Sequence, residues 1–229
     1  MKKLVIIRHG ESEWNQKNLF TGWVDVELSE KGKAEAKRAG ELMKEAGLDF
    51  DVCYTSYLKR AINTQQIALK VMEREWLPVI KSWRLNERHY GALSGLNKKE
   101  TAEKYGDEQV HIWRRSFDVR PPQMEEDNPY SARKNPAYRN VPVEDVPMCE
   151  SLKDTIARTV PYFENEIKPL VMEGKRVFIA AHGNSLRSLI KYFENISDED
   201  IINVEIPTGT PLVYEFDDDF KVTNKYYLK

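Results

Sequence analysis

Two unbroken apolar runs predict the centre of the fold. Residues 4–7 and 177–181 contain no polar position, which is typical of strands buried on both faces of a parallel sheet. Each run leads into a His-Gly pair, at His9 and His182. If the strands are neighbours, both imidazoles lie at the carboxyl edge of the sheet, where open α/β sheets bind ligands. The alternative is two unrelated histidines at strand ends.

The rest of the chain alternates between buried runs and stretches with helical spacing. We expect further strands at 50–55 and 77–80, and helices at 29–47, from 56 onward, and at 97–106, 109–116, 150–174 and 185–194. This order predicts an α/β three-layer sandwich, a mostly parallel central sheet with helices on both faces. Residues 212–216 and 220–227 alternate around an acidic turn and predict a hairpin with one antiparallel edge strand.

Three stretches show neither the helical nor the strand period of hydrophobic residues. Residues 11–22 form a polar loop, residues 83–91 mix acids, bases, aromatics and glycine, and residues 121–149 are rich in proline and charge. Long irregular segments next to strand ends are often functional loops. We therefore expect one domain over 1–229, with a loop and helix excursion at about 92–149 that covers the site.

Composition excludes several classes of function. The 229 residues carry 35 basic and 37 acidic side chains, a formal net charge of −2, so no global field attracts nucleic acid or an anionic membrane. No apolar run approaches the length of a membrane span. Cys53 and Cys149 have neither metal nor redox spacing and are expected to be reduced thiols in a cytoplasmic protein.

The remaining chemistry-bearing residues point to phosphoryl transfer. They comprise two imidazoles, one acid and several cations, whereas cysteine clusters, paired metal-binding histidines and Walker glycine loops are missing. A neutral imidazole can attack phosphorus, and arginine forks can stabilise the charge on its oxygens without a metal. The candidates are His9, His182, Glu87, Arg8, Arg60, Lys98, Arg114 and Arg115.

These residues lie in motifs that resemble a known family over residues 4–228. The chain is similar to the cofactor-dependent phosphoglycerate mutases of the histidine phosphatase superfamily. The Arg-His-Gly motif marks only the superfamily, whereas the later motifs are specific to the mutase branch. The matching segments are RHGESEWN at 8–15, TGW at 21–23, ERHYG at 87–91, GLNK at 95–98, WRR at 113–115 and HGNS at 182–185.

The resemblance implies a glycolytic and gluconeogenic isomerase that interconverts 3-phosphoglycerate and 2-phosphoglycerate. His9 would carry a phosphoryl group supplied by 2,3-bisphosphoglycerate, Glu87 would relay the proton of the substrate hydroxyl, and His182 with Arg8 and Arg60 would stabilise the transferring group. No metal is expected. Ser12, Asn15, Thr21, Gly22, Gly183 and Asn184 would line the phosphoryl pocket, and Arg88, His89, Tyr90, Lys98, Arg114 and Arg115 would surround the carboxylate and second phosphate.

Two other functions stay open at this point. The first is a phosphatase of the same superfamily, in which water discharges His9, and the second is an inactive regulator that binds phosphorylated ligands. Family members usually continue past the final Tyr-Tyr-Leu with a Lys- and Ala-rich tail, whereas this sequence stops at Lys229, which leaves the balance between mutase and hydrolase open. The resemblance also implies a homodimer or homotetramer.

Overall fold

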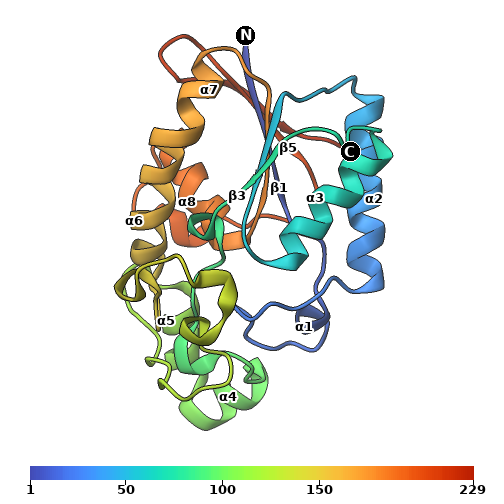
Figure 1. Ribbon diagram of the computed structural model, residues 1–229. Coiled ribbons are helices and arrows are strands. Elements are labelled where there is room, and N and C mark those ends of the chain that lie inside the picture. The colour runs from blue at the N-terminus through green and yellow to red at the C-terminus, as the bar shows by residue number, and fades with distance from the viewer.

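A six-stranded sheet forms the middle of the protein in the computed structural model, which describes residues 1–229 (Figure 1). The strand order is β3-β2-β4-β1-β5-β6. The strands are β1 (Lys2–Arg8), β2 (Val52–Thr55), β3 (Val79–Lys81), β4 (Val177–Ala181), β5 (Leu212–Phe216) and β6 (Val222–Tyr227).

Strand pairing confirms the predicted fold class. β1, β2, β3 and β4 are mutually parallel, and β1 lies directly beside β4 with Leu4 opposite Val177 and Arg8 opposite Ala181. β5 runs against β1 and forms the predicted hairpin with β6. The strand of opposite direction is therefore β5, one position inside the edge. Pro78 directly precedes β3, which is the other edge strand.

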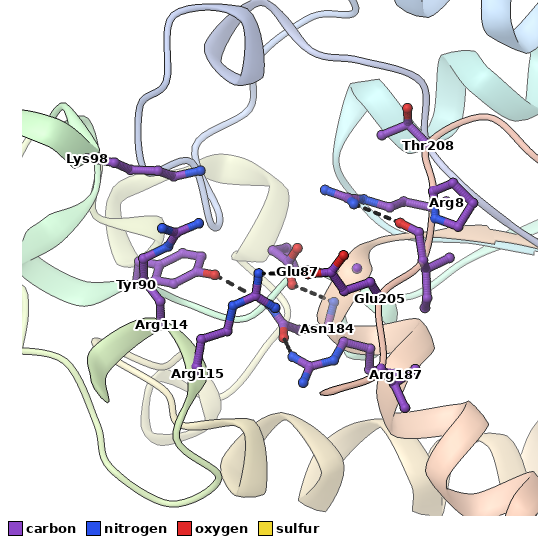
Figure 2. Close-up of a pocket in the computed structure, with 14 residues that line it drawn as sticks. Arg8, Glu87, Tyr90, Lys98, Arg114, Arg115, Asn184, Arg187, Glu205 and Thr208 are labelled. Atoms are coloured by element: carbon purple, nitrogen blue, oxygen red, sulfur yellow. Dashed lines mark hydrogen bonds and ion pairs between the residues drawn. The ribbon is translucent and has the colours of Figure 1, made fainter. Parts of the chain in front are cut away.

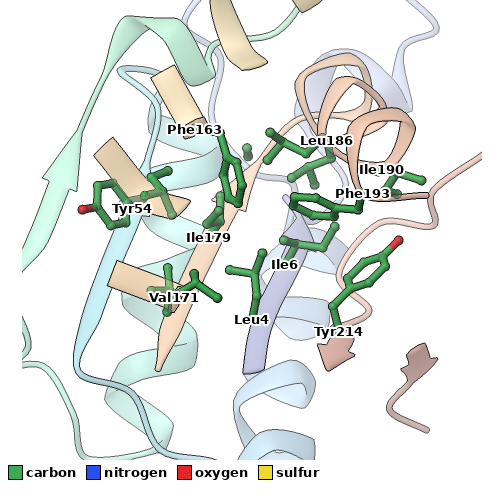
Figure 3. Packing of buried hydrophobic residues seen from close by; sticks show 14 of the residues in the cluster. Leu4, Ile6, Tyr54, Phe163, Val171, Ile179, Leu186, Ile190, Phe193 and Tyr214 are labelled. Atoms are coloured by element: carbon green, nitrogen blue, oxygen red, sulfur yellow. The ribbon is translucent and has the colours of Figure 1, made fainter. Parts of the chain in front are cut away.

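Helices cover both faces of the sheet (Figure 1). On one face α2 (Glu30–Glu45) and α3 (Lys59–Val71) enclose a cluster that includes Val5, Ile7 and Phe178. On the other, α7 (Lys168–Met172) and α8 (Gly183–Glu194) pack on Leu4 and Ile6 (Figure 3), and α6 (Leu152–Tyr162) packs against α8. Successive residues of β1 thus enter different cores, which explains why the run has no polar position.

Some helix bounds differ from the sequence-based expectation. The polar loop at 11–22 contains the short helix α1 (Glu13–Gln16), because Ser12 and Asn15 form a reciprocal capping box. Helix α3 begins at Lys59, later than expected, because residue 58 still has extended backbone. The helix expected over 150–174 is interrupted by a π-helical turn at Phe163–Ile167, between two prolines.

The segment between β3 and α6 extends beyond the sheet. It contains α4 (Lys98–Tyr105) and α5 (Asp107–Arg115), and short 3₁₀ turns fill much of the rest. These turns are Trp83–Leu85, Gly91–Leu93, Ala132–Lys134, Pro136–Tyr138 and Val143–Asp145, and a last one, η7, spans Asp200–Asn203 ahead of β5. Helices α4 and α5 lie below the sheet in Figure 1, on the side of α1. None of the helices is long and apolar enough to cross a membrane.

Candidate active site

Two imidazoles meet where β1 and β4 end. The His9 amide donates to the carbonyl of Ala181 at 3.0 Å, and the centroids of the His9 and His182 rings are 5.1 Å apart. β1 and β4 are neighbours, which was the condition for a site shared by the two histidines. Both rings are buried, with 3% and 0% of the residue exposed.

The backbone sets the tautomer of His9. Its Nδ1 lies 2.6 Å from the carbonyl oxygen of Gly10, which can only accept, so Nδ1 carries the proton and donates. The lone pair is then on Nε2. Burial, and next the cations of Arg60 and Arg8, hold the pKa of His9 well below its usual value. His9 is therefore a neutral imidazole with one basic nitrogen, as a nucleophile requires.

A serine hydroxyl contacts the second ring, that of His182. The Ser56 hydroxyl lies 2.7 Å from His182 Nε2, and its oxygen already accepts from the amide of Leu58 at 3.1 Å. When the hydroxyl donates its proton to Nε2, the ring proton lies on Nδ1, which is the same tautomer as in His9. This Nδ1 is buried without a partner in the protein. Burial, followed by the charge of Arg60, lowers the pKa of His182.

Two arginines complete this end of the site. Arg60 is 1% exposed and donates to the carbonyls of Val24 and Gly22 at 2.9 and 2.6 Å, while burial lowers its pKa to about 10. Arg8 donates through Nη1 to the carbonyl of Ile206 at 2.9 Å, and its buried Nε has no partner. Their backbone contacts fix two positive charges next to the imidazoles.

Glu87 supplies the acidic group. Its Oε1 accepts from the amides of Asn184 and Arg88 at 3.1 and 2.7 Å, and 8% of the residue is exposed. Gly183 packs against it: a Cβ there would lie 3.7 Å from Glu87 Oε2 and 3.5 Å from Arg8 Nε. Oε2 thus faces the end of the site where Arg8 lies.

A cavity of about 660 Å³ opens next to these groups (Figure 2). Residues of the segment that holds α4 and α5 form one wall, and residues from β1, α8 and the stretch before β5 form the opposite wall. Burial and the charges of Arg114 and Arg8 lower the pKa of Lys98 to about 8, a sign of crowded positive charge. The polar lining residues are Arg8, Glu87, Tyr90, Lys98, Arg114, Arg115, Asn184, Arg187, Glu205 and Thr208.

A smaller cavity of about 60 Å³ lies at His9 itself. Gly22 lies here with φ of 54°, and a Cβ would be 3.1 Å from the Arg88 carbonyl and the Tyr90 amide, so this turn requires glycine. The two cavities share four residues, which connects the reacting end to the cationic end. The small cavity is lined by Arg8, His9, Asn15, Leu19, Thr21, Gly22, Arg60, Glu87, Tyr90 and Lys98.

Four of the expected site residues line neither cavity. One is His182, whose buried ring is described above. Ser12 is fully buried as the N-cap of α1. Arg88 is also fully buried and donates to the carbonyls of Glu150, Trp113 and Arg114. His89 packs against Trp23, where burial lowers its pKa to about 3. Arg88 and His89 thus support the wall from behind.

Several residues of this region were not predicted from the sequence. Ser56 follows the end of β2, which lies beside β4, so the strand-end rule used for the histidines could have found it. Arg187 and Glu205 line the large cavity, and Arg158 holds the Glu87 backbone through a 2.8 Å bond to its carbonyl. The partners of Arg158 and Glu205 are 71 and 90 residues away, so no local pattern marks these two residues.

Comparison with known proteins agrees with the geometry. The sequence profile of the histidine phosphatase superfamily (branch 1) matches residues 4–145. Proteins named 2,3-bisphosphoglycerate-dependent phosphoglycerate mutase from Treponema denticola and Lachnoclostridium phytofermentans are 65% and 63% identical, over 99% of this chain and 92% and 91% of their own lengths. A relative from Lactobacillus johnsonii, of the same name with the suffix 1, is 60% identical over 100% of this chain and 99% of its own length.

Solved structures share the fold at low sequence identity. A putative α-ribazole-5′-P phosphatase from Escherichia coli superposes with a TM-score of 0.74 at 17% identity, over 100% of this chain and 98% of its own. A mycobacterial glucosyl-3-phosphoglycerate phosphatase complexed with VO3 gives 0.72 at 22%, over 99% and 97%. The chain belongs to the 2,3-bisphosphoglycerate-dependent phosphoglycerate mutases of the histidine phosphatase superfamily.

Proposed function

We propose that His9 carries the phosphoryl group while this chain, as a member of its family, interconverts 3-phosphoglycerate and 2-phosphoglycerate. The single observation that supports this role most is the tautomer of His9. Its Nδ1 donates to the Gly10 carbonyl, so Nε2 has a free lone pair among fixed cations. A neutral, oriented imidazole is the form that attacks phosphorus.

Glu87 moves the proton in each transfer. When His9 Nε2 forms its bond to phosphorus, the phosphorus–oxygen bond of the donor breaks, and Glu87 protonates the departing oxygen. In the reverse step Glu87 takes the proton of the accepting hydroxyl as the nitrogen–phosphorus bond breaks. Both hydrogen bonds of this carboxyl go to Oε1, which leaves Oε2 for the proton.

The groups around His9 stabilise the charge of the transferring phosphoryl group. His182 Nδ1 and Arg8 Nε are buried donors without a protein partner. Arg60 adds a buried positive charge next to both imidazoles. Donors held in place for the charge of a transition state lower the barrier most when they need no reorganisation. We assign the walls of the phosphoryl pocket to Asn15, Thr21, Gly22, Gly183 and Asn184, which line the two cavities, and Ser12 supports them as the buried N-cap of α1.

The large cavity fits a small, highly charged ligand. Its lining includes five cationic side chains: Arg8, Lys98, Arg114, Arg115 and Arg187. When bound, 2,3-bisphosphoglycerate supplies the phosphoryl group that first charges His9. Tyr90, Lys98, Arg114 and Arg115 would bind the carboxylate and second phosphate, while Arg88 and His89 hold this wall from behind.

The mutase interpretation is favoured over a phosphatase by the names of the full-length relatives. A mutase must keep water from the phosphorylated imidazole. The excursion at about 92–149 contributes Lys98, Arg114 and Arg115 to the cavity wall, and we assign it this shielding role within one domain.

Product analysis and mapping of His9 test this function together. The protein is incubated with 3-phosphoglycerate and a trace of 2,3-bisphosphoglycerate, and we expect 2-phosphoglycerate as the main product. Mass spectrometry should then locate an acid-labile phosphate on His9. His9→Ala should lose transfer by at least about a thousandfold, as is common when a nucleophile is removed, with its melting temperature little changed. Release of inorganic phosphate as the main product, or near-normal turnover of the variant, would refute the proposal.

The reaction is proposed to need no metal ion. Arg8, Arg60 and His182 supply the positive charge and the donors that magnesium provides in other phosphoryl-transfer enzymes. Incubation with EDTA should therefore leave the rate of the mutase reaction unchanged. Strong inhibition, reversed by a divalent cation, would contradict this part of the scheme.

Assembly and compartment are proposals of the same kind. A glycolytic role places the protein in the cytoplasm, and the family suggests a homodimer or homotetramer. Size-exclusion chromatography with light scattering tests the assembly. A monomer at micromolar concentration would exclude both oligomers under those conditions.

A further inference from the structure

One acidic side chain lies on the rim of the cationic cavity and pairs with a residue assigned to the ligand. Glu205 Oε1 is 3.2 Å from Arg115 Nη2, and the two side chains are 76% and 35% exposed. Apart from the proton carrier Glu87, Glu205 is the one acid among the lining residues. A carboxylate at this position is unexpected in a site for anions.

The pair joins the two walls of the cavity, as Figure 2 shows. Arg115 is the last residue of α5, and the preceding carbonyls of Trp113 and Arg114 accept from buried Arg88. Glu205 lies between η7 and β5.

The backbone on the Glu205 side is also held. Arg187 donates to the Ile201 carbonyl at 2.6 Å, and Arg8 donates to the Ile206 carbonyl at 2.9 Å. The pair can therefore open by rotation of one exposed and one half-buried side chain, with no movement of either wall.

We propose that Glu205 is an affinity-determining residue that competes with the ligand for Arg115. The inference rests on the proposed function, in which Arg115 binds the non-reacting anionic end. A phosphate or carboxylate that takes the guanidinium fork must displace Glu205 and then lies next to its negative charge. Glu205 is remote from the transferring group, so it weakens binding of the ground state and of the transition state equally. Its removal should therefore change KM and leave kcat unchanged.

Removal of this charge should tighten ligand binding. In Glu205→Gln we expect the KM for 3-phosphoglycerate to fall about three- to fivefold, and the concentration of 2,3-bisphosphoglycerate for half-maximal activity should fall by the same factor. This factor is the effect that an exposed ion pair typically has on an equilibrium constant. The value of kcat should stay within about twofold. Added KCl should shrink the difference, because exposed charges are screened. Glu199→Gln, at an exposed acid that does not line the cavity, should leave both constants unchanged.

A double-mutant cycle separates direct competition from general repulsion. Arg115→Ala alone should raise the KM, and adding Glu205→Gln in that background should give no further change. If Glu205→Gln lowers the KM equally with and without Arg115, the carboxylate acts through long-range charge and the proposal is wrong.

Binding without turnover distinguishes this inference from the proposed function. Calorimetric titration of 3-phosphoglycerate into His9→Ala, with and without Glu205→Gln, should show the same three- to fivefold gain in affinity. An unchanged or weaker affinity would overturn the competition. If wild type binds 3-phosphoglycerate but produces no 2-phosphoglycerate, the proposed function fails and the binding data still decide the role of Glu205.

Discussion

At the scale of single residues, hydrogen bonds to one ring nitrogen decide what the other can do. His9 donates from Nδ1 to a carbonyl, which leaves the lone pair on Nε2. When Ser56 donates to His182 Nε2, the proton of that ring is on Nδ1. The two rings then share one tautomer, but His9 offers a lone pair and His182 offers a proton, with ring centroids 5.1 Å apart. A neutral state of both rings fits their lowered pKa values.

Removal of the Ser56 hydroxyl should weaken catalysis through His182. In Ser56→Ala no group specifies the tautomer of His182, so a fraction of the protein presents an acceptor to the phosphoryl group. We expect kcat to fall about tenfold or more, typical for loss of an orienting partner, with a KM within about twofold. Steady-state kinetics measure both constants.

The matched control is Thr155→Val. Thr155 lies on α6, and its buried hydroxyl also makes a hydrogen bond, to the Ser151 carbonyl at 3.1 Å. It should leave kcat within about twofold, since a neutral hydrogen bond contributes only about 1 kcal/mol to stability. A Ser56→Ala variant as active as this control would show that the serine does not act through His182.

At the scale of elements, α6 holds the segment that carries Glu87. Arg158 on α6 donates to the carbonyls of Arg84, Asn86 and Glu87 at 2.8–3.0 Å, and it pairs with Glu150 at 2.8 Å. The two charged side chains are only 9% and 5% exposed. Because the segment at 84–89 has no regular backbone ladder, these bonds satisfy its buried carbonyls.

Breaking this pair should be costly for stability. Arg158→Met keeps most of the side-chain length but leaves the Glu150 charge buried without its partner, which is expected to lower the free energy of unfolding by about 3–5 kcal/mol. Urea denaturation provides the measurement. Adding Glu150→Gln should recover part of the loss.

A more exposed ion pair, formed by Asp154 of the same helix with Arg120 from outside it, is the control. Arg120 bonds Asp154 through two nitrogens at 2.7 and 2.8 Å, yet its side chain is 63% exposed. Arg120→Met should cost less than about 1 kcal/mol. Equal losses for the two variants would mean that burial does not matter to the Arg158 contact.

At the scale of the whole molecule, strand order gathers the site. β4 lies between β1 and β2, so the residues that follow the three strands, among them His9, Ser56 and His182, meet at one edge. The excursion then adds cations from the other side. The resulting enclosure buries His9, His89 and His182, and burial lowers the pKa of each.

This burial makes the folded state sensitive to acid. The unfolded chain binds protons at these histidines below pH about 6.5, whereas the folded chain does not until lower pH, near 3 for His89. Stability is therefore complete above pH about 6.5 and decreases as the pH falls. Each histidine contributes up to about 1.4 kcal/mol per pH unit in this window.

Urea denaturation at pH 8, 7, 6 and 5 tests the effect. The free energy of unfolding should be nearly constant from pH 8 to 7 and fall below pH 6. In His9→Ala the slope below pH 6 should be about one third smaller, because one of three such groups is removed. A free energy that stays constant down to pH 5 would contradict this account.

Local sequence patterns predicted the sheet, most of the helices, and the candidate site residues that lie next to each other in motifs. They were wrong about the loop at 11–22, where Ser12 and Asn15 cap a short helix. They also offered no way to separate residues that face the cavity from those behind it: Arg88 and His89 are adjacent to Glu87 in sequence but are buried outside both cavities.

The sequence by itself determined the strands, because burial on both faces requires apolar residues at every position, and the His-Gly ends that mark the chemistry. Only the tertiary structure decided the state of each group. The tautomer of His182, the anchoring of Glu87 and the Arg115–Glu205 pair depend on partners 126, 71 and 90 residues away. Such contacts exist only once strand order and packing have brought distant segments together, so no local pattern can predict them.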